Sequence, residues 1–162
     1  ARGLKTEEDF ETAIDLTLDA FIPPNYIPNE SQKLDIYKRI AGIENGEEAE
    51  DMLEELLDRF GEPPRSVQNL LAVAELKALA HRAYITEMKQ TGETIRITLY
   101  EKARLEAEGI PKLLQQYGND LSFKLENNPY FLLKFRPSKT RKTGVLDRAR
   151  GFAEALCGYV QE

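Results

Sequence analysis

Acidic side chains are concentrated in one short stretch of this sequence, residues 44–62, which holds nine carboxylates and a single basic residue, Arg59. Paired carboxylates can carry out general acid–base catalysis, so a hydrolase that uses two of them is one hypothesis. A dense set of carboxylates can also form a surface that recognises a basic partner. The choice between these depends on which face of its secondary structure presents each carboxylate.

The same stretch has the apolar repeat of an amphipathic helix. Its apolar residues recur at helical spacing and predict a helix over Glu47–Phe60 with one buried face, made of Ala49, Met52, Leu53, Leu56, Leu57 and Phe60. At about 100° per residue, the charged residues Glu48, Asp51, Glu55, Asp58 and Arg59 fall on the opposite face. Glu55 precedes Arg59 by four residues, the favourable order for a helical ion pair. This outer face is either solvated surface or a docking surface for a basic partner.

Other residue types that carry chemistry are scarce. His81 is the only histidine and Cys157 the only cysteine, which excludes a zinc site built from these residues. The glycines form no phosphate-binding motif. We interpret His81 as a residue at a helix C-terminus, where the helix dipole favours it, and Cys157 as a small core residue. The sequence therefore predicts no catalytic residue, no cofactor-binding residue and no metal ligand.

A basic stretch near the end of the chain is the second charged feature. Within residues 134–150 one acid, Asp147, accompanies seven bases, namely Lys134, Arg136, Lys139, Arg141, Lys142, Arg148 and Arg150. Such side chains are what phosphate contacts require, so a nucleic-acid-binding module is the alternative function. No RNA-binding aromatic pattern or glycine-rich clamp accompanies them.

Length and composition agree with one globular domain of 162 residues and no transmembrane segment. We expect residues 1–11 to be a polar linker from a preceding domain, since the chain opens without a methionine, and residues 12–162 to form a single domain. One cysteine fits a reducing compartment, and we expect a cytoplasmic location. Residues 1–80 carry a net charge of −10 and residues 81–162 a net charge of +4, which suggests two surfaces with different partners.

The order of the expected elements indicates an α+β fold, with an N-terminal three-helix cluster followed by a small, mainly antiparallel sheet covered by helices. Prolines in residues 22–28 impose an extended segment, with Tyr26 and Ile27 as its anchors. Helices are expected near 29–40, 47–60 and 63–83, the first burying Leu34, Tyr37, Ile40 and Ala41. Strands are expected near 14–18, 85–90, 94–100, 121–125 and 130–135, and further helices near 110–117 and 143–160.

Four blocks of the sequence resemble the C-terminal domain of the bacterial transcription-repair coupling factors, the Mfd family. They read IDLTLDAFIP at 14–23, QKLDIYKRIA at 32–41, ELLDRFGEPP at 55–64 and NLLAVAEL at 69–76. The order and spacing of the blocks match as well. The resemblance covers nearly all of the chain beyond the linker and is densest over residues 14–85.

The resemblance implies a regulatory fragment that is not itself an enzyme. Full-length members are ATP-driven translocases on duplex DNA that displace stalled RNA polymerase and recruit UvrA. ATP and magnesium are accordingly expected in motor domains elsewhere in the parent protein. This domain is expected to dock on the UvrB-like N-terminal module and to mask the UvrA-binding surface.

The resemblance also assigns residues to this autoinhibitory contact. The family uses the two acids and the arginine of the ELLDRFG block, which here are Glu55, Asp58 and Arg59. We expect Glu55 and Asp58 to pair with basic side chains of the module, and Arg59 to form a fork with a carboxylate. Glu48 and Asp51 are expected as charges at the rim of the contact.

Overall fold

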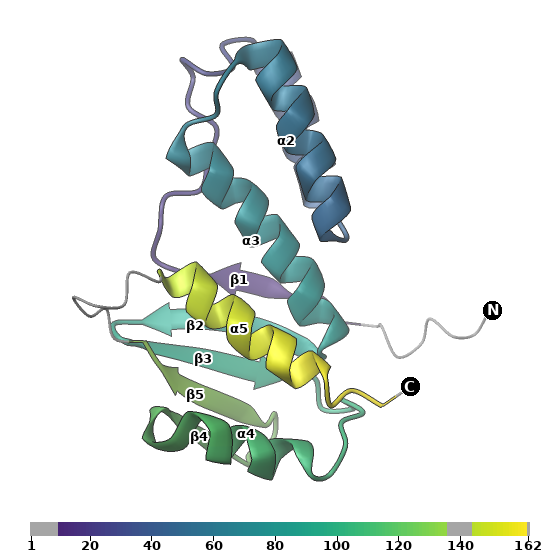
Figure 1. The fold of residues 1–162 in the computed structure, drawn as a ribbon, viewed down its shortest axis with the longest axis vertical. Coiled ribbons are helices and arrows are strands. Elements are labelled where there is room, and N and C mark those ends of the chain that lie inside the picture. Colours follow the sequence, from purple (N-terminus) through teal and green to yellow (C-terminus); the bar gives the residue numbers. More distant parts are fainter. Residues whose placement is uncertain (1–9, 136–143, 162) are drawn as a thin grey trace, which may run out of the picture. The chain divides into compact units, whose positions relative to one another are not determined.

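The computed structural model of the chain describes residues 10–135 and 144–161, and these form two compact units (Figure 1). Residues 18–78 make a unit of helices, here called the helical unit. The remaining described residues make a unit built around a sheet, here called the sheet unit. The predicted α+β class is confirmed. Residues 1–9 of the expected linker lie outside the described residues.

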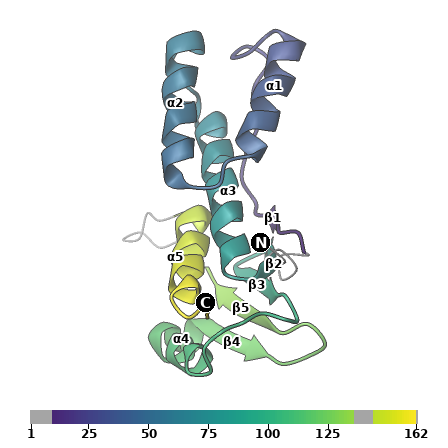
Figure 2. The ribbon, with the colours of Figure 1, turned by 90° about the vertical axis from the view of Figure 1, so that its right-hand side faces the viewer.

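The helical unit contains α1 (Glu30–Ala41), α2 (Gly46–Phe60) and the larger part of α3 (Arg65–Arg82), which Figure 2 shows from the side. Asn29 caps α1, because its side chain accepts a hydrogen bond from the backbone N–H of Gln32 at 2.9 Å. The proline-rich segment before α1 was predicted to be extended but forms a turn at residues 24–26. The backbone N–H groups of Tyr26 and Ile27 donate to the carbonyl oxygen of Pro23 at 3.0 and 3.3 Å. The fixed φ of proline suits a turn as well as an extended chain, so the prolines alone did not decide between them. Its two anchors hold, since Ile27 is fully buried and the Tyr26 hydroxyl donates to the carbonyl oxygen of Gly61 at 2.8 Å.

The core of the helical unit corrects the expected buried face of α1. Of the four residues expected to be buried, Ile40 is buried and Tyr37 is partly buried, as predicted, whereas Leu34 and Ala41 are exposed and Ile36 is buried instead. Leu34 and Ile36 both lie at helical spacing from Ile40 or Tyr37, so periodicity alone did not separate them. The two isoleucines pack with residues of the other helices and of the proline-rich segment in one cluster, comprising Ile22, Ile27, Ile36, Ile40, Ile43, Ala49, Met52, Leu56, Val67 and Leu71. Burying this larger apolar pair leaves Leu34 on the outer side of α1.

The sheet unit is built on five strands in the order β1-β2-β3-β5-β4. These are β1 (Ala13–Asp15), β2 (Ile85–Thr91), β3 (Thr94–Leu99), β4 (Leu121–Lys124) and β5 (Tyr130–Lys134). β1 pairs with β2 in parallel, and all other neighbours are antiparallel, which confirms the expected mainly antiparallel sheet. Ile95, Ile97 and Leu99 of β3 point to the same face and are buried, as their period of two predicts.

Two helices complete the sheet unit, α4 (Gly109–Tyr117) and α5 (Val145–Cys157). A short 3-10 turn, η2 (Gly118–Asp120), leads from α4 to β4. In Figure 1 α5 lies across one face of the sheet. Phe152 of α5 meets Phe131 of β5 with ring centroids 5.0 Å apart, and both side chains are fully buried. These aromatic contacts anchor α5 on the sheet.

Candidate protein-interaction surface

The ends of α2 are set by its own sequence, which decides the residues that face outward. The Asn45 side chain accepts from the backbone N–H of Glu48 at 2.9 Å, and the Glu48 carboxylate accepts from the backbone N–H of Glu44 at 2.8 Å. This arrangement resembles a capping box. At the other end Gly61 has a φ of +86°, a region that glycine enters without steric cost. The helix thus begins at Gly46, one residue before the predicted start.

The candidate residue Glu55 lies in a hydrogen-bonded cluster with two arginines. Arg39, from the last turn of α1, donates from Nη1 to Oε2 of Glu55 at 2.6 Å and from Nη2 to Oε1 at 2.5 Å. Arg59 donates from Nη1 to Oε2 at 2.8 Å, so the predicted helical pair is present. Both carboxylate oxygens of Glu55 are therefore occupied by charge-assisted hydrogen bonds within the helical unit.

The two arginines change the acidity of this carboxyl. The hydrogen bond from Arg39, and then that from Arg59, lowers the pKa of Glu55 from 4.5 to about 2. The same bond from Glu55 raises the pKa of Arg39. Glu55 is consequently ionised at neutral pH and neutralises one of its two arginines. Within the helical unit Glu55 thus holds Arg39 and Arg59, and its expected pairing with a basic side chain of another module stays a prediction.

The other candidate residues are exposed. Asp58 and Asp51 make no hydrogen bond or ion pair with any residue in the two described ranges, so both carboxylates face solvent. Arg59 keeps 38% of its side chain exposed, and its guanidinium lies 4.9 Å from the centre of the Phe60 ring. One of its five N–H donors forms a hydrogen bond with Glu55. Glu48 is also exposed but already serves as a helix cap.

Arg39 is the residue that sequence reasoning missed. It follows Lys38 in the last turn of α1, where basic residues are ordinarily explained by the helix dipole. The short connection between α1 and α2 makes the two helices neighbours. Which side chains then meet depends on the crossing angle of the helices, which the sequence does not state. We define the charged patch as Arg39, Glu55, Asp58 and Arg59, whose formal charges sum to zero.

Residues 16–110 of the chain match the model of one protein family, described as the TRCF domain. The chain belongs to the TRCF domain family. The matched range holds all four residues of the charged patch, and it confirms the resemblance carried by the sequence blocks at 14–76.

Relatives of this TRCF domain are much longer proteins. The chain is 40% identical over 124 residues to a transcription-repair-coupling factor of Bacillus subtilis (strain 168), covering 75% of this chain and 10% of the relative. It is 37% identical over 131 residues to the factor of Staphylococcus aureus (strain USA300), covering 78% of this chain and 11% of the relative. The chain thus spans about a tenth of the length of these relatives.

A solved structure shares the fold of this TRCF domain. The crystal structure of the C-terminal domain of a transcription-repair coupling factor superposes with a TM-score of 0.78 and covers 92% of this chain and 93% of that chain. The two sequences are 24% identical, so the match establishes the fold alone.

Only part of the basic stretch at residues 134–150 of this TRCF domain lies within the described residues. Arg136, Lys139, Arg141 and Lys142 lie outside the described residues. Arg148 is engaged in the structure: Nη2 pairs with Asp120 at 3.1 Å, Nε donates to the Lys134 carbonyl oxygen at 3.3 Å, and the guanidinium lies 5.1 Å from the Tyr117 ring centre. Its 19% exposed side chain holds α5 against η2 and β5. Arg148 is therefore a structural residue here, and a nucleic-acid role for the stretch stays a prediction.

The single histidine and the single cysteine of the TRCF domain, His81 and Cys157, are explained by their local surroundings. His81 Nδ1 lies 3.1 Å from the hydroxyl of Thr12, and the Phe10 ring stacks on the His81 ring with centroids 4.3 Å apart. Thr12 gives its own proton to the Ile85 carbonyl oxygen at 2.6 Å, so Nδ1 of His81 is the donor to Thr12. Burial raises the pKa of the Cys157 thiol, although Arg82 opposes the shift, so little reactive thiolate forms.

No cluster of three or more metal-ligating side chains occurs within residues 10–135 and 144–161. In the same ranges, no helix is both long and apolar enough to span a bilayer.

Proposed function

We propose that this chain is a regulatory docking domain within a transcription-repair coupling factor that acts in transcription-coupled DNA repair. Membership of the TRCF domain family supports the assignment to such a factor. The parent protein is an ATP-driven translocase on duplex DNA that acts on stalled RNA polymerase, and its motor lies outside this chain. The chain itself contributes an interaction surface and no catalysis.

The docking partner is the UvrB-like N-terminal module of the same protein, and docking masks the surface that binds UvrA. The observation that carries the proposal is the charged patch, in which Asp58 and Arg59 of α2 are both exposed to solvent. Asp58 is the open acceptor for a basic side chain of the module. Arg59 offers its remaining N–H donors to a carboxylate, while Glu55 and Arg39 hold it in place. Asp51 supplies a rim charge.

Because the two parts belong to one chain, a contact made of a few ion pairs is enough to hold the domain in its docked state. Two parts of one chain meet at an effective concentration near the millimolar range. A few exposed ion pairs, each worth about 0.2–1 kcal/mol, can then hold a closed state that other contacts release. Docking and UvrA binding exclude one another, so the two states form a switch.

The test is a charge swap in the full-length parent protein. Asp58→Lys combined with Arg59→Glu leaves the net charge unchanged and places a like charge opposite each expected partner. We expect the affinity for UvrA to rise about tenfold, within the range typical of coupling between sites. Isothermal titration with purified UvrA measures the change.

The matched control exchanges two exposed charges of the sheet unit, Lys124→Glu with Glu126→Lys. Like the swap at Asp58 and Arg59, this exchange leaves the net charge unchanged. It should leave the affinity for UvrA unchanged. Equal affinities for the swapped, control and unmodified proteins, with the fold verified by circular dichroism, would rule out masking through this patch.

A further inference from the structure

A groove between α2 and α3 is a second feature of the helical unit, and it goes beyond the proposed function. It has a volume of about 400 Å³ and is lined by Ala49, Glu50, Leu53, Leu57, Glu62, Pro63, Gln68, Leu71, Ala72 and Glu75. Leu57 leaves 43% of its surface exposed there, although the apolar repeat predicted it to be buried. The groove therefore offers apolar surface that the described residues 10–135 and 144–161 leave uncovered.

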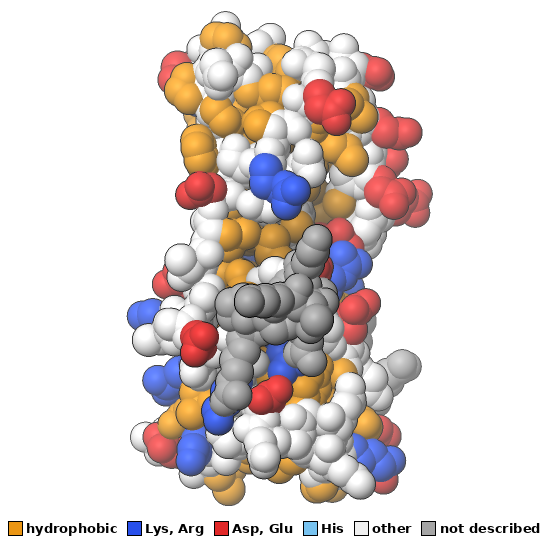
Figure 3. Space-filling model, turned by 60° about the vertical axis from the view of Figure 1, so that its left-hand side comes forward, with side chains coloured by type: hydrophobic (Ala, Val, Ile, Leu, Met, Phe, Trp, Pro, Cys, Tyr) orange, Lys and Arg blue, Asp and Glu red, His pale blue; other side chains and the backbone are white. Residues whose placement is uncertain are grey.

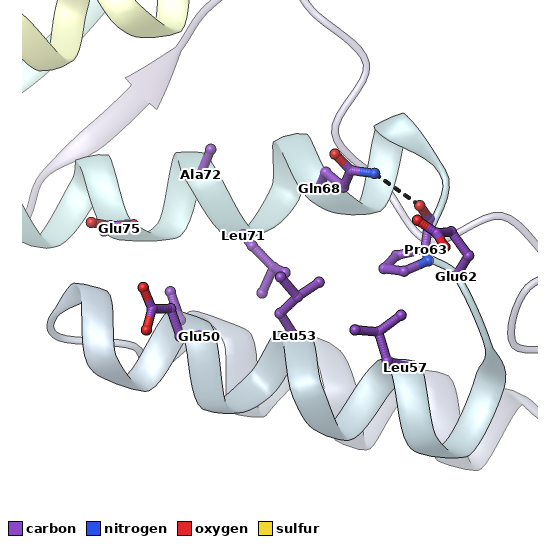
Figure 4. Close-up of a pocket in the computed structure, with 10 residues that line it drawn as sticks. Glu50, Leu53, Leu57, Glu62, Pro63, Gln68, Leu71, Ala72 and Glu75 are labelled. Atoms are coloured by element: carbon purple, nitrogen blue, oxygen red, sulfur yellow. Dashed lines mark hydrogen bonds between the residues drawn. The ribbon is translucent and has the colours of Figure 1, made fainter.

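The groove is apolar in the middle and acidic at both ends (Figure 4). Leu53 and Leu57 of α2 and Leu71 of α3 occupy its centre. Glu50 and Glu75 lie at one end, and Glu62 lies at the other. The Gln68 side chain donates to the Pro63 carbonyl oxygen at 3.0 Å and fixes that second end. No lysine or arginine is among the lining residues.

The helical unit around the groove is also acidic. Residues 18–78 hold thirteen acidic and six basic side chains, a net charge of −7. Figure 3 shows one face of the molecule on which hydrophobic side chains gather over the helical unit, with acidic side chains at their border. A partner suited to this surface has apolar side chains flanked by basic ones. A second copy of this helical unit has the wrong sign of charge.

The dimensions of the groove favour a helical occupant. On α2 the lining runs from Ala49 to Leu57 and on α3 from Gln68 to Glu75, about two helical turns on each side. A helix laid along two helices presents apolar residues at spacings of three and four over this length. Its flanking lysines or arginines would then reach the acidic ends.

We propose that this groove binds a basic amphipathic helix of a partner protein. The site is separate from the charged patch, because Leu57 lies about 160° around α2 from Glu55 and Arg59 and about 100° from Asp58. The helical unit thus presents two docking surfaces on opposite flanks of one helix. The patch takes a partner by paired charges, whereas the groove takes one by apolar side chains with basic flanks.

A designed peptide serves as the probe. It is a fluorescein-labelled helix of about 14 residues, made of leucine and lysine in helical repeat, and it is titrated into the 162-residue chain by fluorescence anisotropy. We expect saturable binding that Leu57→Lys weakens about tenfold, as for a central apolar anchor. Glu50→Lys with Glu62→Lys should weaken it to a similar extent. Replacing lysine by glutamate in the peptide should abolish binding.

Matched variants keep the test specific. Leu34→Lys alters an exposed leucine of α1 that is 56% exposed, and Glu47→Lys with Glu54→Lys alters exposed acids of α2 outside the groove. Both should change the affinity less than about twofold. The charge swap at Asp58 and Arg59 should also leave peptide binding intact, which separates this proposal from the proposed function.

Three results would overturn the groove proposal. One is unsaturable peptide binding, and another is a loss of affinity that is equal in groove and control variants. The third is a dimer of the chain in sedimentation velocity that Leu57→Lys dissociates, since the occupant would then be a second copy. Leu57→Ser, a smaller change at the same position, repeats the test if the lysine variant fails to fold.

Discussion

Two arginine–carboxylate clusters of this chain differ in how many elements their arginines join. In the helical unit Glu55 is held by Arg39 and Arg59, and in the sheet unit Asp120 is held by Arg148. Arg148 is 19% exposed and contacts three separate elements, whereas Arg59 is 38% exposed and, among the described residues, contacts Glu55 and Phe60 of its own helix. The number of elements that an arginine joins therefore separates a structural residue from a surface available to a partner.

The comparison predicts its largest effect at Arg148. Arg148→Met keeps the length of the side chain but removes both hydrogen bonds and leaves the Asp120 carboxylate without its partner. We expect a loss of about 2 kcal/mol of unfolding free energy, the scale of hydrogen bonds to charged groups. Urea denaturation of the isolated chain measures it, and hydrogen exchange of the α5 amides locates it.

Arg59→Met is the matched change in the other cluster. Because Arg59 is exposed and its contacts within the described part of the chain stay on α2, this variant should lose about 0.5 kcal/mol or less. A larger loss at Arg59 than at Arg148 would reverse the assignment of the two roles.

Local sequence signals were sufficient for most of the fold. The apolar repeat delimited α2 to within one residue, and the alternation of Ile95, Ile97 and Leu99 identified β3. These signals depend on residues that are close together in the sequence, so they can be recognised without the structure. The buried face of α1 was predicted only in part: Ile40 is buried as expected, but Leu34 is exposed and Ile36 is buried. Both leucine and isoleucine fit the helical repeat, and only packing against the other helices selects Ile36.

The part of the candidate site that lies along a single helix was predictable from the sequence. The helical repeat placed Asp58 and Arg59 outward and paired Glu55 with Arg59, because both inferences use spacing along one helix. Arg39 and the α2–α3 groove arise from contacts between helices. The sequence contains the residues for both, but the crossing of the helices that assembles them is a property of tertiary packing.

A smaller effect is expected within the patch cluster itself. A double-mutant cycle with Arg39→Met and Glu55→Gln should give a coupling free energy of about 1 kcal/mol, the upper range for an exposed pair with bidentate geometry. The four unfolding free energies come from urea denaturation at low salt. The same cycle with Lys38→Met should show no coupling, and a coupling indistinguishable from zero at Arg39 would remove Glu55 from its positioning role.

The smallest effect is the dependence of this cluster on acid. The pKa of Glu55 is lowered to about 2 by Arg39 and Arg59, against an ordinary value of 4.5 in the unfolded chain. Folding therefore gains from the ionised carboxyl above about pH 4.5, and the gain declines as the pH falls towards 2, because the unfolded chain binds the proton first. Glu55→Gln has no proton to bind, so the stability difference between the unmodified chain and this variant should narrow steadily between pH 5 and pH 2, with no trend from pH 5 to pH 7. A difference that stays constant down to pH 2 would mean that the arginines do not hold the ionised form of Glu55, and the charged patch would then lack the fixed geometry that distinguishes it from an ordinary solvated helix face.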